Sequence, residues 1–192
     1  SPVSARLSAD GAHSSALDGV RFGTLVRHAD QRGAFRELWR SAADDPGDRF
    51  VQANLSSSRA GVLRGLHLHR RQRDLWIVAS GRAHVALVDV RSMLAPVGAE
   101  RPIVETRELS ADDWVEIPRG VAHGFLALEA LDLIYFVSNE FDGTDELGFA
   151  WDDPTAAVPW PVVTGTPDGL PILSDRDRSN PSLVALVASL RP

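Results

Sequence analysis

Between residues 20 and 137 the sequence consists of short apolar segments, each ended by a turn signal such as Ser80-Gly81. This pattern of many short strands with regular turns favours an all-β sandwich or barrel. A parallel α/β fold would need helical crossovers, and no long helical period precedes residue 180. The expected strands are Val20–Val26, Phe35–Trp39, Phe50–Leu55, Leu75–Ala79, His84–Val90, Val104–Leu109, Trp114–Ile117, Gly124–Leu128 and Leu133–Val137.

The two ends of the chain differ from this pattern. Residues 1–18 are small and polar with little periodicity, so we expect a flexible N-terminal arm followed by a single domain over residues 19–192. Apolar residues recur at helical spacing in Ser182–Leu190, directly after Pro181, which predicts a short amphipathic C-terminal helix. At 192 residues the chain is long enough to bury a substantial core.

Composition argues against several classes of function. The net charge of −6 disfavours non-specific nucleic-acid binding, and no run of about 18 apolar residues is present to cross a membrane. The N-terminus lacks the pattern of a signal peptide and the chain has no cysteine, so we expect a cytoplasmic protein without disulfides or thiolate chemistry. All 20 basic residues are arginine, which excludes a lysine Schiff base or lysine general base.

The most informative stretch for chemistry is Gly61–Gly81, which contains a His-x-His pair and a carboxylate between two glycines. Alternate residues of a strand face the same side, so His67 and His69 would both point into a barrel or both out of it. Pro118–His123 later supplies Pro-x-Gly-x-x-His. These spacings resemble the metal-ligand pattern of cupin barrels. A site for Fe, Mn, Ni or Zn would be formed by His67, His69, Asp74 and His123.

An interpretation without metal fits the same residues. The usual cupin carboxylate is Glu where this chain has Asp74, and the usual Asn four residues after the last histidine is Ala127. His69 would then be a polar side chain lining the barrel, and Asp74 would pair with Arg71 or Arg73. Both interpretations stay open at this point, because spacing alone does not decide between them.

Longer stretches of the chain point to one family. They are Asp30–Glu37, Gln52–Ser56, Gly61–His67, Gly120–Leu126, Trp151–Pro154, Trp160-Pro161 and Leu173–Asp177. Their order, over roughly residues 20–180, resembles the dTDP-4-dehydrorhamnose 3,5-epimerase (RmlC) family of the cupin superfamily. The resemblance implies a double-stranded β-helix (jelly-roll, cupin) barrel and a homodimer. It also implies a cofactor-free reaction on a nucleotide-linked, dTDP-type 4-keto-6-deoxyhexose.

The family reaction removes a proton beside the C4 ketone and returns one from the opposite face, which requires a base on one side and an acid on the other. By resemblance His67 is the base and Asp177 is its carboxylate partner, with Asp175 in that place if the register differs by two. A carboxylate bonded to one imidazole nitrogen fixes the tautomer and stabilises the charged ring. Tyr135, the only tyrosine, falls at the position of the family acid. Its alternative role is a core tyrosine with a bonded hydroxyl.

Further residues fall where the family binds the sugar and the nucleotide diphosphate. Arginine suits phosphate because its planar guanidinium donates hydrogen bonds in pairs. Arg32 and Arg64 are therefore the strongest of these candidates, and the alternative for any single one is a surface ion pair. The expected substrate-binding set is Arg32, Glu37, Asn54, Ser56, Arg64 and His123.

Two positions depart from the family pattern. His69 stands where the family commonly has Gln, and Asp74 stands where it has a cavity Lys that is expected to help hold the enolate oxygen. A metal ion could take over that role as a Lewis acid. We therefore expect an epimerase first. The alternatives are a metal-dependent cupin oxidoreductase, oxygenase or isomerase, and a non-catalytic protein that binds sugar nucleotides.

Overall fold

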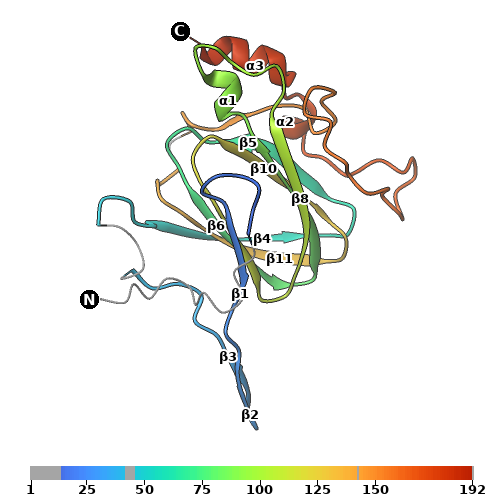
Figure 1. Cartoon of the computed structure of the whole chain (residues 1–192). Helices are drawn as coiled ribbons and strands as arrows, with labels where there is room; N and C mark the ends of the chain where they lie inside the picture. Colours follow the sequence, from blue (N-terminus) through green and yellow to red (C-terminus); the bar gives the residue numbers. More distant parts are fainter. Residues whose placement is uncertain (1–13, 42–45, 142, 192) are drawn as a thin grey trace.

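The computed structural model describes residues 14–41, 46–141 and 143–191, and Figure 1 shows two β-sheets packed face to face. The first sheet, in the order β1-β9-β6-β11-β4, consists of Arg21–Thr24 (β1), Asp113–Ile117 (β9), Asp74–Ser80 (β6), Leu131–Val137 (β11) and Gln52–Ser58 (β4). The second, in the order β12-β5-β10-β7-β8, consists of Leu147–Gly148 (β12), Leu63–Leu68 (β5), Val121–Ala127 (β10), Arg82–Asp89 (β7) and Ile103–Ser110 (β8). Strand pairing within both sheets is antiparallel, and the expected all-β jelly roll is confirmed.

Alternation along the strands separates an inner face from an outer face of each sheet. On β6, Trp76 and Val78 belong to the core between the sheets. Leu75 and Ile77 point the other way and form a separate cluster, against which Trp39 packs. Because successive strand residues face opposite sides, every second residue of the central strands points into the space between the sheets.

Three short helices lie together at one end of the molecule (Figure 1): α1 (Arg91–Leu94), α2 (Asp175–Arg178) and α3 (Leu183–Leu190). The sequence predicted α3 correctly, and the Ser182 side chain caps it by accepting from the N–H of Ala185 at 3.2 Å. The buried residues of α3 pack with outer-face residues of the second sheet. Within the described ranges, no helix is long and apolar enough to cross a membrane.

Asp153 attaches the start of α3 to the chain that precedes it. Its buried carboxylate accepts the N–H groups of Thr155 at 2.9 Å and Ala156 at 3.1 Å through Oδ1. Oδ2 accepts the N–H of Leu183, at the first turn of α3, at 2.9 Å. A carboxylate that accepts three N–H groups stabilises both a turn and a helix start. These bonds give a structural role to Asp153, the second aspartate of the Trp151–Pro154 stretch.

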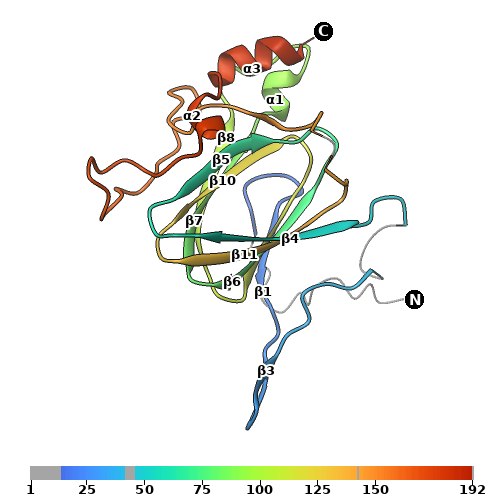
Figure 2. The same ribbon diagram turned by 180° about the vertical axis from the view of Figure 1, so that it is seen from behind.

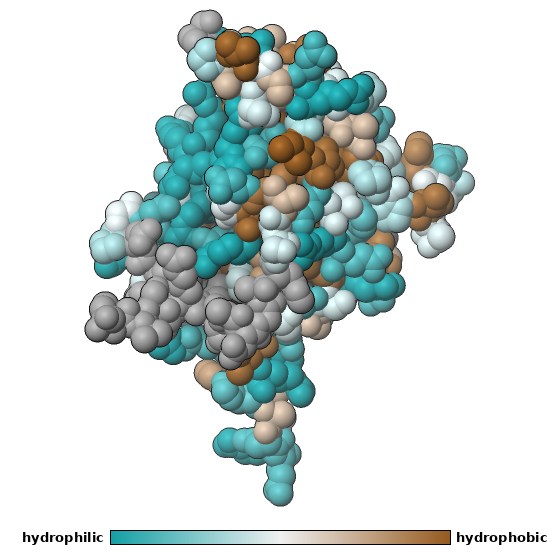
Figure 3. Space-filling view, viewed as in Figure 1, coloured by the Kyte–Doolittle hydropathy of each residue, from teal (hydrophilic) through white to brown (hydrophobic). Residues whose placement is uncertain are grey.

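A hairpin of His28–Asp30 (β2) and Gly33–Phe35 (β3) projects from the end opposite the helices (Figure 2). In the space-filling view it stands clear of the body and is hydrophilic towards its tip (Figure 3). The predicted strand Phe35–Trp39 is therefore wrong, since β3 ends at Phe35 and residues 36–40 have no regular structure. Burial of Trp39 beside Phe50, rather than sheet pairing, fixes this segment.

The start of the domain lies before the predicted boundary at residue 18. Leu17 is 2% exposed and belongs to the core between the sheets. The Ser15 hydroxyl donates to Glu105 of β8, and the carbonyl of Ser14 accepts from Arg107. Residues 14–18 are thus packed against the second sheet, while the remainder of the predicted arm, residues 1–13, lies outside the described residues.

Candidate active site

A cavity of about 390 Å³ opens between the two sheets. Side chains of β4, β6 and β11 form one wall and side chains of β5 and β10 form the other, as the alternation of each strand requires. Most of the residues singled out from the sequence line it. These are Asn54, Ser56, Arg64, His67, His69, Asp74, His123 and Tyr135.

His67 and Asp177 form a hydrogen-bonded pair at this cavity. Nε2 of His67 lies 2.7 Å from Oδ1 of Asp177, which is 4% exposed. Oδ2 of Asp177 accepts the N–H of Gly65 at 3.3 Å. Asp177 is held in α2, whose N-cap Ser174 accepts the Asp177 N–H at 3.0 Å. Of the two carboxylates considered from the sequence, Asp177 and not Asp175 is therefore the partner of His67.

The pKa of Asp177 is lowered despite its burial. Burial by itself raises the pKa of a carboxyl. The hydrogen bond and charge of His67, together with the hydrogen bonds from Gly65 and Ser174, outweigh burial and lower the Asp177 pKa. Asp177 is therefore an anion at neutral pH and can stabilise a positive charge on His67.

Two glycines allow β5 and β10 to approach closely beside this pair. Gly65 has φ +134°, and a Cβ there would lie 2.7 Å from the Cα of Gly124. A Cβ on Gly124 would lie 2.7 Å from the carbonyl oxygen of Arg64. The strand register shifts between His123 and Phe125, after His123 has paired with His67. The missing side chains thus permit the close contact that places both histidines on the cavity wall.

Tyr135 approaches the cavity from the opposite sheet. It lies on β11, between Asn54 of β4 and Trp76 of β6. Burial, followed by the negative charge of Asp74, raises the pKa of Tyr135, although Arg64 acts in the other direction. The phenol therefore keeps its proton at neutral pH and is available as a donor.

His123 is 4% exposed, and its ring meets the Trp76 ring edge to face, with centroids 5.1 Å apart. Burial lowers the pKa of His123 to about 4, even though the nearby Asp74 charge acts to raise it. The ring is therefore neutral at pH 7.

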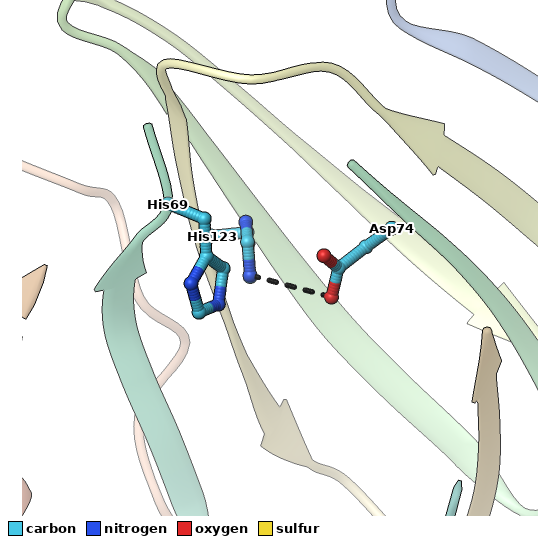
Figure 4. A group of neighbouring side chains, drawn as sticks. All are labelled: His69, Asp74 and His123. Carbon is cyan, nitrogen blue, oxygen red and sulfur yellow. Dashed lines mark ion pairs between the residues drawn. The ribbon is translucent and has the colours of Figure 1, made fainter. Parts of the chain in front are cut away.

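The four predicted metal ligands do not come together as one group. His69, Asp74 and His123 face one another, with ligand atoms within 4.8 Å (Figure 4). His67 is not a member of this cluster, since its Nε2 is bonded to Asp177. Of the four residues predicted as a metal-binding set, the structure therefore brings three together, while the Asp177 carboxylate holds the first histidine of the His-x-His pair.

Asp74 is not ion-paired in the way the metal-free interpretation expects. Its Oδ1 accepts from Nε2 of Gln72 at 2.9 Å and its Oδ2 from Nε1 of Trp76 at 3.2 Å. Arg73 instead donates to Asp48 and Glu116, both at 3.1 Å. Asp74 therefore points inward, at the start of β6, with two neutral donors beside it.

Two predicted substrate-binding residues lie away from the cavity. Arg32 is at the tip of the β2–β3 hairpin, with its side chain 90% exposed, and pairs with Asp30. Glu37 follows the hairpin and accepts from Nε of Arg40 at 2.7 Å. Within one chain neither residue lines the cavity, because the hairpin projects away from the sheets (Figure 1).

Sequence reasoning missed four polar residues of the cavity wall: Gln52, Gln72, Glu146 and Arg176. Nη1 of Arg176 donates to Oε2 of Glu146 at 3.0 Å. The position of Arg176, directly before Asp177 in a stretch that matched the family, is the signal that could have identified it. Gln72 and Glu146 lie outside the predicted strands, where no periodicity shows the direction of a side chain.

A family model for dTDP-4-dehydrorhamnose 3,5-epimerase matches residues 14–185. The chain belongs to this epimerase family. Among its relatives, the spore coat polysaccharide biosynthesis protein SpsL of Bacillus subtilis is 36% identical over 152 residues, which cover 75% of this chain and 96% of SpsL.

Solved structures of RmlC epimerases agree with this assignment. The Mycobacterium tuberculosis rmlC epimerase superposes with a TM-score of 0.80 at 34% identity, covering 94% of this chain and 92% of that one. The Legionella pneumophila RmlC, solved in complex with dTDP-4-keto-L-rhamnose, has a TM-score of 0.79 at 29% identity, covering 95% and 97%. These similarities support the epimerase expectation over the metal-dependent oxidoreductase and the non-catalytic alternatives.

Proposed function

We propose that this protein is an epimerase of a nucleotide-linked 4-keto-6-deoxyhexose. The observation that carries the proposal is that His67 and Tyr135 reach one cavity from facing sheets, His67 on β5 and Tyr135 on β11. A sugar ring held between the sheets then has a base on one face and an acid on the other, as epimerisation requires. The dTDP-linked sugar in the Legionella pneumophila relative supports a dTDP-type substrate.

The hydrogen bond to Asp177 selects the basic atom of His67. The Asp177 carboxylate only accepts, so Nε2 of His67, 2.7 Å away, carries the ring proton. Nδ1 is then the free lone pair that removes the proton beside the ketone. When Nδ1 becomes protonated, the charged imidazole is already paired with the buried Asp177 anion.

Tyr135 is the proposed acid that returns a proton to the opposite face. Its raised pKa, caused by burial and the Asp74 charge, means that the hydroxyl is protonated over the neutral range. The proton therefore leaves only when a strong base, such as the enolate carbon, lies beside it.

Arg64 and Arg176 are the proposed diphosphate-binding residues of the cavity wall. They come from β5 and α2 and supply positive charge to a cavity that is also lined by Asp74 and Glu146. Nε of Arg64 donates to the Ser58 hydroxyl at 3.0 Å, which orients its guanidinium. A planar guanidinium recognises phosphate with paired donors.

We also propose that the enzyme acts as a homodimer in which Arg32 and Glu37 serve the cavity of the partner chain. Both positions were assigned to substrate binding by family resemblance, yet neither lines the cavity of its own chain. Phe35 on the hairpin and Leu55 on the edge strand β4 are 68% and 65% exposed. Among the described residues, β4 has no strand on its outer side. Exposed apolar side chains on a projecting hairpin and on such a sheet edge favour pairing with a second copy.

Solvent deuterium exchange into a dTDP-4-keto-6-deoxy sugar tests the function. Wild-type protein is expected to incorporate deuterium beside the ketone. His67→Ala and Tyr135→Phe should each lower the rate of turnover by about 10²-fold or more, because each removes a proton-transfer group. Nuclear magnetic resonance of the product identifies which carbons exchange.

His84→Gln is the matched control for the His67 variant. His84 lies on β7, its side chain does not line the cavity, and it packs against Trp160. This variant should exchange deuterium at the wild-type rate. The proposal would be contradicted if His67→Ala exchanged deuterium at the wild-type rate, or if the wild-type protein exchanged none.

A further inference from the structure

Three buried side chains, His69, Asp74 and His123, meet inside the substrate cavity (Figure 4). They are called the triad cluster here. His69 directly follows β5, Asp74 starts β6 and His123 lies on β10, so both sheets contribute. Their exposures are 7%, 3% and 4%, and one nitrogen or oxygen atom from each lies within 4.8 Å of the others. The proposed reaction uses none of these three side chains as its acid or base.

Backbone carbonyls fix the tautomers of both rings in the triad cluster. Nδ1 of His69 lies 2.7 Å from the carbonyl oxygen of Asp145, and Nδ1 of His123 lies 3.1 Å from that of Val121. A carbonyl only accepts, so each Nδ1 donates its proton and each Nε2 of a neutral ring bears a lone pair. Histidines that bind metals characteristically donate their other ring N–H to a carbonyl or carboxylate in this way.

The lone pairs of the triad cluster face a carboxylate without a proton between them. Nε2 of His123 lies 3.8 Å from Oδ2 of Asp74, which is too long for a hydrogen bond. The donors that orient the carboxylate, Gln72 and Trp76, are both neutral. Buried anions are unfavourable unless a positive charge compensates them. Two imidazole nitrogens and a carboxylate facing one space therefore favour a cation at their centre.

We propose that the triad cluster binds a divalent first-row transition metal ion through Nε2 of His69, Nε2 of His123 and the carboxylate of Asp74. Two imidazoles and one carboxylate form a donor set for Fe, Mn, Ni or Zn. The carbonyls behind the rings and the Gln72 and Trp76 donors behind the carboxylate act as outer partners that orient these ligands.

This site leaves the proposed base free. His67 is bonded to Asp177 and is not a ligand, so an ion and a basic His67 are compatible in one cavity. In a chain without lysine, a bound ion would supply Lewis-acid stabilisation of an enolate oxygen beside Tyr135 and His67. That consequence rests on the proposed epimerase function, whereas ion binding itself does not.

Metal titration of untagged, chelator-treated and dialysed protein tests the site. Isothermal titration with Zn²⁺, and with Co²⁺ followed by its visible absorption, should give one ion per chain. His69→Gln and Asp74→Asn each remove a ligand while keeping a similar shape. Each should weaken binding by more than the ~10–100-fold that loss of an outer partner costs.

Two control variants separate this site from other histidines and from catalysis. His28→Gln removes an exposed imidazole of the hairpin and should bind the ion as the wild type does. His67→Gln should also keep the ion but lose solvent exchange, so failure of the metal site and failure of the proposed function give different results. Wild-type protein that binds no stoichiometric ion overturns the proposal, and so does unchanged affinity in His69→Gln. If Asp74→Asn proves unfolded by circular dichroism, His69→Gln alone decides.

Discussion

A buried neutral histidine in the cavity links protein stability to pH. Burial lowers the pKa of His123 from 6.5 to about 4. Between these values the unfolded chain binds a proton at this histidine that the folded chain does not. The corresponding stabilisation is complete above pH 6.5, decreases as the pH falls and is lost once the pH is below about 4. Its full size is on the order of 3 kcal/mol.

His123→Gln should remove this pH dependence. Between about pH 7.5 and about pH 4.5, the metal-free wild type should lose roughly 2 to 3 kcal/mol more unfolding free energy than the variant, because the variant lacks the titrating group. Urea unfolding of chelator-treated protein at both pH values measures the difference. The same pH dependence in both proteins would show that His123 is not protonated on unfolding in this range.

Side-chain positions within strands could be predicted from the sequence better than positions in loops. His67, Asn54, Ser56 and Tyr135 were placed by matching motifs, and strand alternation carries them to one cavity. Arg32 could not be placed, because its location depends on the direction in which a hairpin leaves the domain. Motif matching offered both Asp175 and Asp177, and only the turn of α2 determines which one meets His67.

At the scale of elements, the close approach of β5 to β10 positions the two histidines that pair across these strands. The Gly65→Ala substitution tests whether this close approach is required, and Gly33→Ala is the matched control. Gly65 and Gly33 have φ of +134° and +137°, so alanine strains the backbone similarly at both. A Cβ at Gly33 has no atom within 4 Å, whereas one at Gly65 lies 2.7 Å from Gly124 Cα and 3.0 Å from the His123 carbonyl oxygen.

Gly33→Ala should therefore lower the unfolding free energy by about 1 kcal/mol. Gly65→Ala should cost roughly 2 kcal/mol more, because the added methyl collides with the backbone of β10. Urea denaturation of both variants at neutral pH measures the two losses. Equal losses would mean that β5 and β10 can separate without cost.

Element predictions were accurate where the apolar pattern is strong. The apolar run of β7 and the helical spacing of α3 were both recognised. The segment Phe35–Trp39 was expected to be a strand, yet Trp39 packs in an aromatic cluster with Phe50 and Phe136, a tertiary contact that leaves no local periodicity. The burial of Leu17 was missed for a similar reason, because a single apolar residue in a polar stretch shows no periodic pattern.

At the scale of the whole molecule, the proposed homodimer predicts complementation between two inactive variants. Arg32→Ala impairs the site that its hairpin enters in the partner, while His67→Ala impairs the site of its own chain. After unfolding and refolding as an equal mixture, half of the dimers are mixed, and each mixed dimer has one intact site. Activity should recover to about a quarter of the wild-type value.

Exchange assays on the refolded mixture, compared with each variant refolded alone, measure this recovery. A refolded mixture of His67→Ala and Tyr135→Phe is the negative control, and it should show no recovery of activity. Both residues line one cavity of one chain, so a mixed dimer has no intact site. No recovery with Arg32→Ala would mean that the hairpin does not complete the neighbouring cavity.

The pair formed by His67 and Asp177 joins positions that are 110 residues apart. Until α2 docks, His67 has neither the carboxylate that sets its tautomer nor the charge that stabilises its protonated form. Formation of the catalytic pair therefore depends on the docking of a segment that follows every strand of both sheets in the sequence.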